Sequence, residues 1–342
     1  MPGRPTIADV ARAAKVSVST VDRVINGRDP VKKPTAERVL TAAETIGFYA
    51  AGVIRQRLGE DRPAKTLGFL LLQKSRSFYQ ILGDSMAEAT RASALIQGTP
   101  KIVHLEDFEP MAVAAEMERL GKAVDAIAVV AANHPHIAAA ISGLHDKGVP
   151  VFALISELSA NVPVGYAGLD NFKVGRTAAW AIANICKAPG KIAIIVGSHR
   201  FRCQDLNEMG FRSYFREHAP EFTLLEPLSS LEDAHYAAEI TRDLLARIPD
   251  LAGLYVAGGG MSGVLAALRE REARREIVTV GHDLTSHTRT GLIDGVIKLV
   301  ISHPVMSLAQ SLVAVMAQAT LGSNDVPPAL ILPFDIHTAE NA

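Results

Sequence analysis

Short apolar runs alternate with helix-like segments over residues 66–337, and this alternation constrains the fold more than any other feature. The apolar runs are TLGFLLL, KIVHLEDF, AIAVVAA, VPVFALI, KIAIIVG, FTLLEPL, LAGLYVA, EIVTVGH and VIKLVIS. Strands that are apolar along their whole length are typical of parallel sheets covered by helices on both faces. Because the pattern starts again near residue 160, we expect two similar doubly wound lobes.

Ligands bind at the carboxyl ends of the strands in such folds, so we expect a small molecule in the cleft between the lobes. Motifs for other chemistry are missing. Gly258-Gly259-Gly260 lacks the Lys-Ser/Thr of a phosphate loop, no GxGxxG follows an apolar run, and Gly197-Ser198-His199 is not a GxSxG elbow. His282, Asp283 and His287 have no further ligands at zinc-site spacing. We therefore expect no enzyme activity, no cofactor and no metal site.

The sequence also predicts a cytoplasmic location. Cys186 and Cys203 lack a CxxC spacing and are expected to be free thiols in a reducing compartment. Residues 1–20 carry four charged side chains and no apolar core suited to a signal peptide. No window of about 18 uncharged apolar residues occurs, so no membrane span is expected.

The formal net charge of −1 conceals an uneven distribution. Residues 1–65 hold 12 Lys or Arg and 7 Asp or Glu, a balance of +5. Of the 35 basic and 36 acidic residues in the chain, 23 and 29 remain for the body, a balance of −6. A basic segment on an acidic body is typical of nucleic-acid binding. Chance gives such a difference as well, so the residue pattern of the first segment has to decide.

That pattern predicts a helix-turn-helix. Thr6 can cap a first helix and Ser17 a second, which Asn26-Gly27 ends, and a third helix starts near Thr35. Apolar residues at helical spacing are expected to pack the three helices together: Ile7, Val10, Ala11, Ala14, Val16, Val21, Val24, Ile25, Val39, Leu40, Ala43 and Ile46. Two short helices joined by a tight turn form the motif whose second helix enters the major groove.

Polar residues are placed to suit that role. Val18, Ser19 and Arg23 would lie on the groove-facing side of the second helix. Arg23 can make a bidentate contact to guanine and Val18 can pack on a thymine methyl. The residues placed for phosphate contacts are Thr6, Ser17, Thr20, Asn26 and Lys33. The alternative is a three-helix domain for protein contacts, which the basic balance and the polar face disfavour.

The first 50 residues or so resemble the N-terminal DNA-binding domain of the lactose-repressor (LacI/GalR) family. The matching segments are Thr6-Ile7-Ala8-Asp9-Val10-Ala11, Val16-Ser17, Thr20-Val21, Arg23-Val24-Ile25-Asn26-Gly27, Thr35, Glu37-Arg38-Val39 and Ile46-Gly47-Phe48. Lys15 replaces the usual turn glycine, and Asp22 replaces a serine next to the backbone. An acid there repels phosphate unless it pairs with Arg23 or Arg12, or accepts from cytosine N4.

The resemblance implies a hinge helix in the linker, residues 50–65. In the family this helix folds on DNA, and a leucine from each subunit wedges into the minor groove. Ile54-Arg55-Gln56-Arg57-Leu58 is the counterpart here, with Ala50-Ala51 in place of the usual Pro-Asn. Ungapped alignment puts the wedge at Arg57; we favour Leu58 with a one-residue shift, and Arg55 beside it on the DNA. The alternative is a solvated basic linker.

Residues 66–342 resemble the effector domain of the same family, which is like a periplasmic sugar-binding protein of the ribose-binding branch. The residues that carry this resemblance are Phe78-Tyr79, Gly168-Leu169-Asp170-Asn171, Gly175, Gly210-Phe211, Val280-Gly281-His282-Asp283, Leu292-Ile293-Asp294-Gly295 and Pro304. The expected fold is thus an all-α helix-turn-helix head, residues 1–49, plus an α/β body. The body is expected to form two doubly wound parallel-sheet lobes of periplasmic-binding-protein type I.

The expected ligand pocket departs from the sugar-binding pattern. Asn207 replaces a helix arginine, Gly258-Gly259 an Asn-Asp and Ser302 a glutamine, while Asp283 can still accept from sugar hydroxyls. Phe78 and Tyr79 can stack on a sugar ring. The predicted ligand-binding residues are Phe78, Tyr79, Asn133, Arg202, Asn207, Gly258, Asp283 and Ser302.

Some of these assignments have alternatives. Arg200, Arg202 and His199 can replace the missing arginine and favour an acidic or phosphorylated ligand, or they can be surface residues of a solvated loop. Asn133 and Tyr166 are expected either to line the pocket or to be structural.

The resemblance implies a cytoplasmic, nucleoid-associated homodimer that regulates transcription. Its partners would be a pseudo-palindromic operator and a small, sugar-like effector, neutral or acidic, and the family resemblance favours repression over activation. A solute-binding protein for transport would need a signal peptide and no helix-turn-helix. An enzyme on this fold would need an acid/base or nucleophile set in the cleft. The C-terminus has no leucine heptad, so nothing favours a tail-mediated tetramer.

Overall fold

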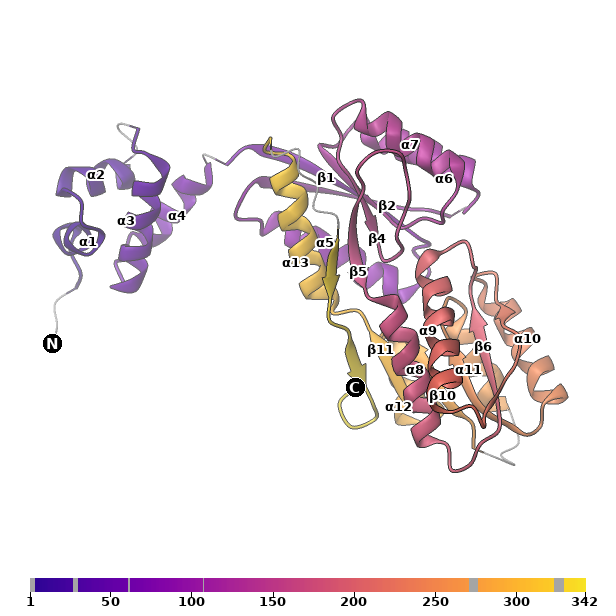
Figure 1. Ribbon diagram of the computed structural model, residues 1–342. Helices are drawn as coiled ribbons and strands as arrows, with labels where there is room; N and C mark the ends of the chain where they lie inside the picture. Colours follow the sequence, from indigo (N-terminus) through magenta and orange to yellow (C-terminus); the bar gives the residue numbers. More distant parts are fainter. Residues whose placement is uncertain (1–3, 27–29, 61, 107, 271–275, 323–328) are drawn as a thin grey trace. The chain divides into compact units, whose positions relative to one another are not determined.

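The computed structural model describes residues 4–26, 30–60, 62–106, 108–270, 276–322 and 329–342 (Figure 1). Two compact units make up the chain. The first comprises Met1–Lys65 and Arg91–Thr99, and the second Thr66–Thr90 and Pro100–Ala342. The linker predicted at 50–65 falls wholly within the first unit. Gly27, Asp61 and Asp107 lie outside the described residues.

Four helices form the head of the first unit: α1 (Ile7–Ala14), α2 (Val18–Asn26), α3 (Lys33–Thr45) and α4 (Ala51–Glu60). The predicted caps are confirmed. Thr6 and Asp9 form a reciprocal capping box at α1, and the Ser17 hydroxyl accepts from the Thr20 N–H at 3.2 Å. The third helix begins two residues before Thr35, because Pro34 sits in its first turn, where no backbone N–H is needed.

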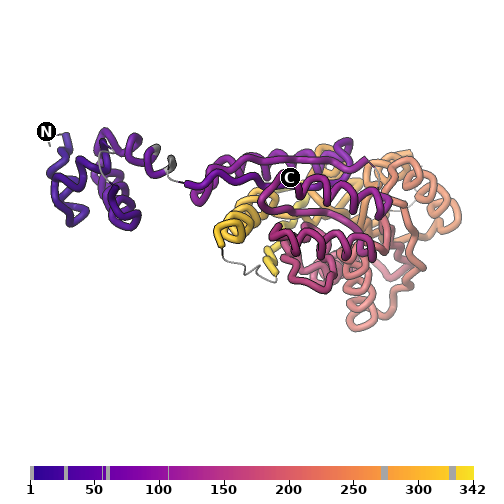
Figure 2. Tube along the Cα trace, turned by 90° about the horizontal axis from the view of Figure 1, so that it is seen from above, coloured from indigo at the N-terminus to yellow at the C-terminus, as the bar shows by residue number. Residues whose placement is uncertain are grey.

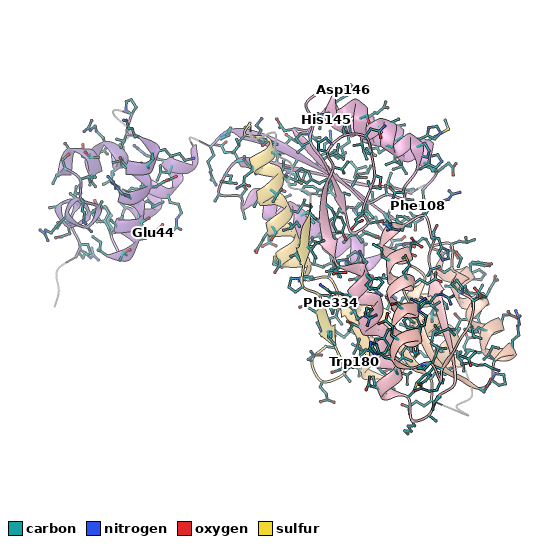
Figure 3. All side chains as sticks on the ribbon, in the orientation of Figure 1. Glu44, Phe108, His145, Asp146, Trp180 and Phe334 are labelled. Carbon is teal, nitrogen blue, oxygen red and sulfur yellow. The ribbon has the colours of Figure 1, made fainter. Side chains whose placement is uncertain are left out.

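The head core is aliphatic and includes α4. Val10, Val21, Val39 and Ile54 are fully buried in one cluster, and Leu58 packs against it. The Arg55 guanidinium also pairs with Glu44, which is labelled in Figure 3. Arg55 Nη2 lies 2.5 Å from Glu44 Oε1. The predicted hinge helix is therefore folded and packed on α2 and α3 of its unit.

The turn between α1 and α2 holds a side chain where glycine is favoured. Lys15 has φ 54° and ψ 47°, the left-handed region, which costs a residue with a Cβ about 1 kcal/mol relative to glycine. We expect Lys15→Gly to raise the local unfolding free energy of the head by about 1 kcal/mol. Slower hydrogen exchange of α1 and α2 amides in the full-length protein would show it.

The matched control is Gly47, which has φ +68° and open space around a Cβ. Gly47→Ala should make exchange in the head faster by a similar factor. Equal exchange rates in Lys15→Gly and wild type would mean that the lysine is tolerated in this turn without cost.

Two mostly parallel sheets form the second unit. The first sheet has the order β12-β5-β4-β3-β1-β2 and the second β13-β11-β10-β9-β6-β7, with β8 also paired to β6. The first contains β1 (Ala64–Leu71), β2 (Gln97–His104), β3 (Ala126–Val129), β4 (Val151–Leu154), β5 (Gly165–Leu169) and β12 (Leu330–Leu332). The second contains β6 (Lys191–Val196), β7 (Thr223–Leu224), β8 (Leu228–Ser229), β9 (Leu251–Val256), β10 (Val278–His282), β11 (Leu299–Ser302) and β13 (Asp335–His337). β13 runs antiparallel to β11.

Helices complete two lobes, as predicted. Lobe 1 consists of the first sheet with α5 (Ser77–Arg91), α6 (Pro110–Gly121), α7 (Pro135–His145) and α13 (Val305–Ala319). Lobe 2 consists of the second sheet with α8 (Asn171–Ile185), α9 (Arg202–His218), α10 (Ala234–Arg247), α11 (Met261–Glu270) and α12 (Ser286–Ile293). Figure 2 shows α13, in yellow, beside the purple elements of lobe 1 that precede it by some 200 residues in the chain.

The chain passes between the lobes three times: after β5, after β11 and after β12. The predicted restart near residue 160 therefore lies at residues 169–171, because β5 still belongs to lobe 1. In the described part of the chain, no helix has the length and apolar character needed to cross a membrane.

Candidate functional site

The outward face of α2 carries the side chains predicted to read DNA. Val18 is 51% exposed, and Ser17 and Ser19 are exposed beside it. Arg23 is half-buried and lies along the helix, with its Nε donating to the Ser19 carbonyl at 3.3 Å. Around this face, Thr6, Asn26 and Lys33 are exposed and Thr20 is half-buried. The structure thus leaves this set accessible to DNA, and its contacts remain predictions.

Asp22 pairs with neither of the two arginines named from the sequence, and its acceptance from cytosine N4 stays a prediction. Its carboxylate accepts from the Asn26 side-chain amide at 2.6 Å, while Arg12 pairs with Asp9 at 3.2 Å. The Thr6 side chain, followed by its backbone N–H and by Arg12, lowers the pKa of Asp9, which keeps this cap ionised. The Asn26 amide, a predicted phosphate contact, is thus occupied by Asp22.

The predicted wedge, Leu58, is half-buried against the head core, and Arg55 is exposed but paired with Glu44. Insertion of Leu58 into a minor groove would require this side chain to leave its contacts in the head. The wedge therefore stays a prediction.

A cavity of about 430 Å³ lies in the second unit, at the carboxyl ends of β1, β3 and β4 of lobe 1 and β9, β10 and β11 of lobe 2. This is the cleft predicted from the alternating pattern. Five predicted ligand-binding residues line it: Phe78, Tyr79, Asn207, Gly258 and Asp283. Lobe 1 supplies the two aromatic side chains, and lobe 2 supplies the other three residues.

Three predicted residues lie off the cavity wall, and each makes a hydrogen bond or an ion pair elsewhere. Asn133 Oδ1 accepts from the Ser159 N–H at 3.0 Å, and its backbone N–H donates to the Arg200 carbonyl. Arg202 is exposed and pairs with Asp205 at 2.9 Å. The buried Ser302 hydroxyl accepts from the Leu284 N–H at 3.1 Å.

The proposed substitutes for the missing arginine are surface residues. His199 and Arg200 are both exposed, and His199 Nε2 lies 2.7 Å from a carboxylate oxygen of Glu208. Neither lines the cavity, and nor does Tyr166. The Tyr166 hydroxyl donates to carbonyl oxygens of Ile155 and Leu169, so it supports the first crossover between the lobes.

Asp283 and His303 form a pair in the cavity wall. Asp283 Oδ1 accepts from the backbone N–H of His303 at 3.0 Å and lies 2.8 Å from its ring Nδ1. Burial opposes ionisation, but the charge and hydrogen bonds of His303 outweigh it and lower the pKa of Asp283. A carboxylate only accepts, so Nδ1 carries the proton.

Two buried polar atoms are left without a partner and are open to a ligand. Among the described residues, Asn207 Oδ1 and His303 Nε2 have no hydrogen-bond partner, although their residues are only 2% and 7% exposed. Because Nδ1 of His303 holds a proton toward Asp283, Nε2 is an acceptor in the neutral ring and a donor in the charged ring, and a hydroxyl group can pair with either form. Both residues line the cavity, so a bound molecule with hydroxyl donors can satisfy both.

His282 adds a neutral ring to the wall. Burial lowers the pKa of His282 to about 4, and burial raises the pKa of Tyr255 well above its usual range. The Tyr255 hydroxyl therefore keeps its proton and lies 2.6 Å from His282 Nε2.

Strained backbone is concentrated at the cavity. Ile155, Glu232 and Asp283 all line it, and all have left-handed φ values of 67°, 62° and 58°. Such conformations cost about 1–3 kcal/mol each without glycine and cluster at functional sites. This supports the cavity as the binding site of the body.

Among the wall residues that sequence reasoning missed are His303, Arg76 and Glu232. His303 directly follows β11, whose carboxyl end faces the cavity, and directly precedes Pro304. This position after a strand is the signal that could have identified it. Arg76 and Glu232 form an ion pair across the cleft although 156 residues separate them. No local pattern connects them.

Two families match the chain, one for each unit. Residues 6–50 match the family described as bacterial regulatory proteins, lacI family, and residues 67–324 match the periplasmic binding protein domain. Over nearly its whole length the chain is similar to two curated proteins. It is 26% identical to the sucrose operon repressor of Streptococcus mutans, over 98% of each chain. It is 24% identical to the transcriptional regulator CelR of Thermobifida fusca, over 99% of this chain and 98% of CelR.

Solved structures share the fold of the body. A solute-binding protein from Actinobacillus succinogenes with bound D-allose has a TM-score of 0.74 at 17% identity, over 81% of this chain and 98% of its own. The glucose-galactose binding protein GanP from Geobacillus stearothermophilus has a TM-score of 0.71 at 19% identity, over 81% and 99%. With a lacI-type head on a periplasmic-binding-protein body, the chain belongs to the LacI family of DNA-binding transcription regulators.

Proposed function

We propose that this regulator is a homodimeric repressor of sugar-related genes and that an uncharged sugar bound in the cavity controls its affinity for the operator. The observation that carries the proposal is the pair of buried polar atoms without a partner, Asn207 Oδ1 and His303 Nε2, beside the ionised Asp283. The name of the sucrose operon repressor supports both the sugar and the repression.

The wall offers a sugar two kinds of contact. The Phe78 ring lies 5.4 Å from the His303 ring, centroid to centroid, and provides an apolar surface for the C–H face of a sugar. Hydroxyl groups can donate to Asp283 and to Asn207 Oδ1, and they can pair with His303 Nε2 as donor or as acceptor. Hydrogen bonds to the charged carboxylate contribute about 1.5–3 kcal/mol each and are therefore the largest of these contributions.

The same cavity gives the regulator its control. A sugar that touches both lobes favours one relative arrangement of the lobes, and binding shifts the population of that arrangement. By linkage, whatever factor the sugar applies to operator affinity, the operator applies to sugar affinity. Two copies of α2, one from each subunit, would read the half-sites of a pseudo-palindrome.

Selection of bound duplexes from a random DNA library tests this function. The full-length protein is used alone and with a panel of neutral sugars that includes D-glucose, D-galactose, D-allose and sucrose. We expect a palindromic consensus, and a change in its enrichment with at least one sugar. A consensus without symmetry would contradict the dimeric operator, and enrichment indifferent to every sugar would contradict the effector.

The groove-facing assignment of Arg23 makes a sharper prediction. Arg23→Ala should weaken binding to the consensus by about 1–3 kcal/mol and relax the preference at one base pair per half-site. Lys33→Ala is the control for a phosphate contact: it should weaken all sequences equally and reduce the salt slope by about 1. If Arg23→Ala behaves like this control, Arg23 does not read a base.

A further inference from the structure

One buried ion pair joins the two lobes at the cavity. Arg76 follows β1 of lobe 1, and Glu232 follows β8 of lobe 2. Arg76 Nη1 donates to the Glu232 carboxylate, and Nη2 donates to the Glu232 backbone carbonyl. Their side chains are 19% and 5% exposed, so solvent screens the pair little.

Each partner of the ion pair has a further contact that holds it in place. The Arg76 guanidinium lies 5.7 Å from the centroid of the Phe108 ring, which is labelled in Figure 3. Gln204 Nε2 donates to the other Glu232 oxygen at 2.5 Å. A Cβ on Gly259 would lie 2.2 Å from Glu232 Oε2 and 2.8 Å from Arg76 Nη1, so the glycine leaves room for both charged groups. The arrangement is a built part of the wall.

The charges of the wall are unbalanced. Among the described residues, Arg76 is the only lysine or arginine that lines the cavity, whereas Glu232, Asp233 and Asp283 contribute carboxylates. Glu232 neutralises Arg76, and Asp283 stays ionised beside His303. An anionic ligand would therefore find no uncompensated arginine or lysine and would be repelled by carboxylates.

We propose that Glu232 determines the charge selectivity of the effector site. By occupying Arg76 it restricts the cavity to uncharged, hydroxyl-bearing molecules and excludes phosphates and carboxylates. This inference rests on the proposed function, because it names the chemical class of the effector for the same cavity. It runs opposite to the acidic ligand that Arg200 and Arg202 suggested in the sequence.

Glu232→Gln tests the proposal with inorganic phosphate as the probe. Gln keeps the shape of Glu232 and one of its two acceptor oxygens, and it leaves the charge of Arg76 uncompensated. At pH near 8, where ordinary histidines are neutral, and at constant ionic strength, about 10 mM phosphate should raise the melting temperature of Glu232→Gln by about 2–4 °C relative to chloride. Wild type should show no such difference.

The matched control is the double variant Arg76→Met/Glu232→Gln, which removes both charges and avoids a lone buried carboxylate. It also corrects for the general stabilising action of phosphate salts. A phosphate shift confined to Glu232→Gln supports the proposal. An equal shift in all three proteins, or none in a Glu232→Gln protein that melts cooperatively in chloride, overturns it.

A second measurement uses only wild type and the double variant, in which the charges at positions 76 and 232 are either paired or both absent. Calorimetric titration of wild type with phosphate should show no saturable binding. Millimolar binding that disappears in the double variant would place an anion on Arg76 in the native cavity and overturn the proposal. Operator binding and the response to neutral sugars are measured on the same preparations, so their loss would defeat the proposed function and leave the phosphate result standing.

Discussion

Asp283→Ala should abolish the response to the effector sugar while leaving the operator affinity of the free protein unchanged. The substitution removes an ionised acceptor from the cavity and releases the His303 ring, which Asp283 Oδ1 holds at 2.8 Å. Two lost hydrogen bonds to a charged group correspond to about 3 kcal/mol or more, a loss in sugar affinity of at least about 100-fold. Operator titrations with and without the sugar identified by the panel measure it.

Asp283→Asn separates charge from geometry. Asparagine tolerates the left-handed φ of 58° and keeps an oxygen to accept from His303, while the charge and the second acceptor oxygen are lost. We expect a sugar affinity between wild type and Asp283→Ala. If both variants respond to the sugar as wild type does, Asp283 does not contact the ligand, and the effector binds elsewhere.

The lobes were predictable because long apolar strands leave a strong pattern. Strands β5, β12 and β13 left none, since each has three to five residues and pairs at or near a sheet edge. The run FTLLEPL was expected as one strand but splits into β7 and β8, because Pro227 between them has no N–H to donate. Short elements of this kind are fixed by their neighbours in the sheet rather than by their own residues.

Site residues were predictable where position alone defines them. Phe78, Tyr79 and Asp283 follow strands, so the rule that parallel strands point their carboxyl ends at the ligand located them. The prediction chose Ser302 over the next residue, His303, yet neighbouring residues of an extended chain point to opposite sides, and only His303 lines the cavity. The ion pair of Arg76 and Glu232 needs the folded chain, because no sequence spacing brings the two lobes together.

Gly175→Ala should destabilise the body by about 3 kcal/mol and lower its melting temperature by roughly 6–10 °C. A Cβ on Gly175 in α8 would lie 1.9 Å from the Asn207 carbonyl oxygen in α9 and 2.9 Å from the Phe211 nitrogen. Helix α9 cannot retreat freely, since the Phe211 ring is fully buried and stacks on Tyr255 with centroids 4.9 Å apart. Thermal unfolding of the full-length protein measures the loss.

The Gly175→Ala substitution should also affect the cavity, because the Asn207 carbonyl oxygen, which the new Cβ would contact, belongs to a residue of the cavity wall. Any shift of α9 moves Asn207 and its free Oδ1, so Gly175→Ala should weaken sugar binding at temperatures where the protein is still folded. Gly143 in α7 is the matched control: a Cβ there meets nothing within 4 Å, and Gly143→Ala should stabilise its helix by about 0.5–1 kcal/mol. Opposite signs for the two substitutions would show that close contact of α8 and α9, and not glycine content, fixes the position of Asn207. If Gly175→Ala melts as wild type does, these helices can separate without cost, and Asn207 is held by something other than their packing.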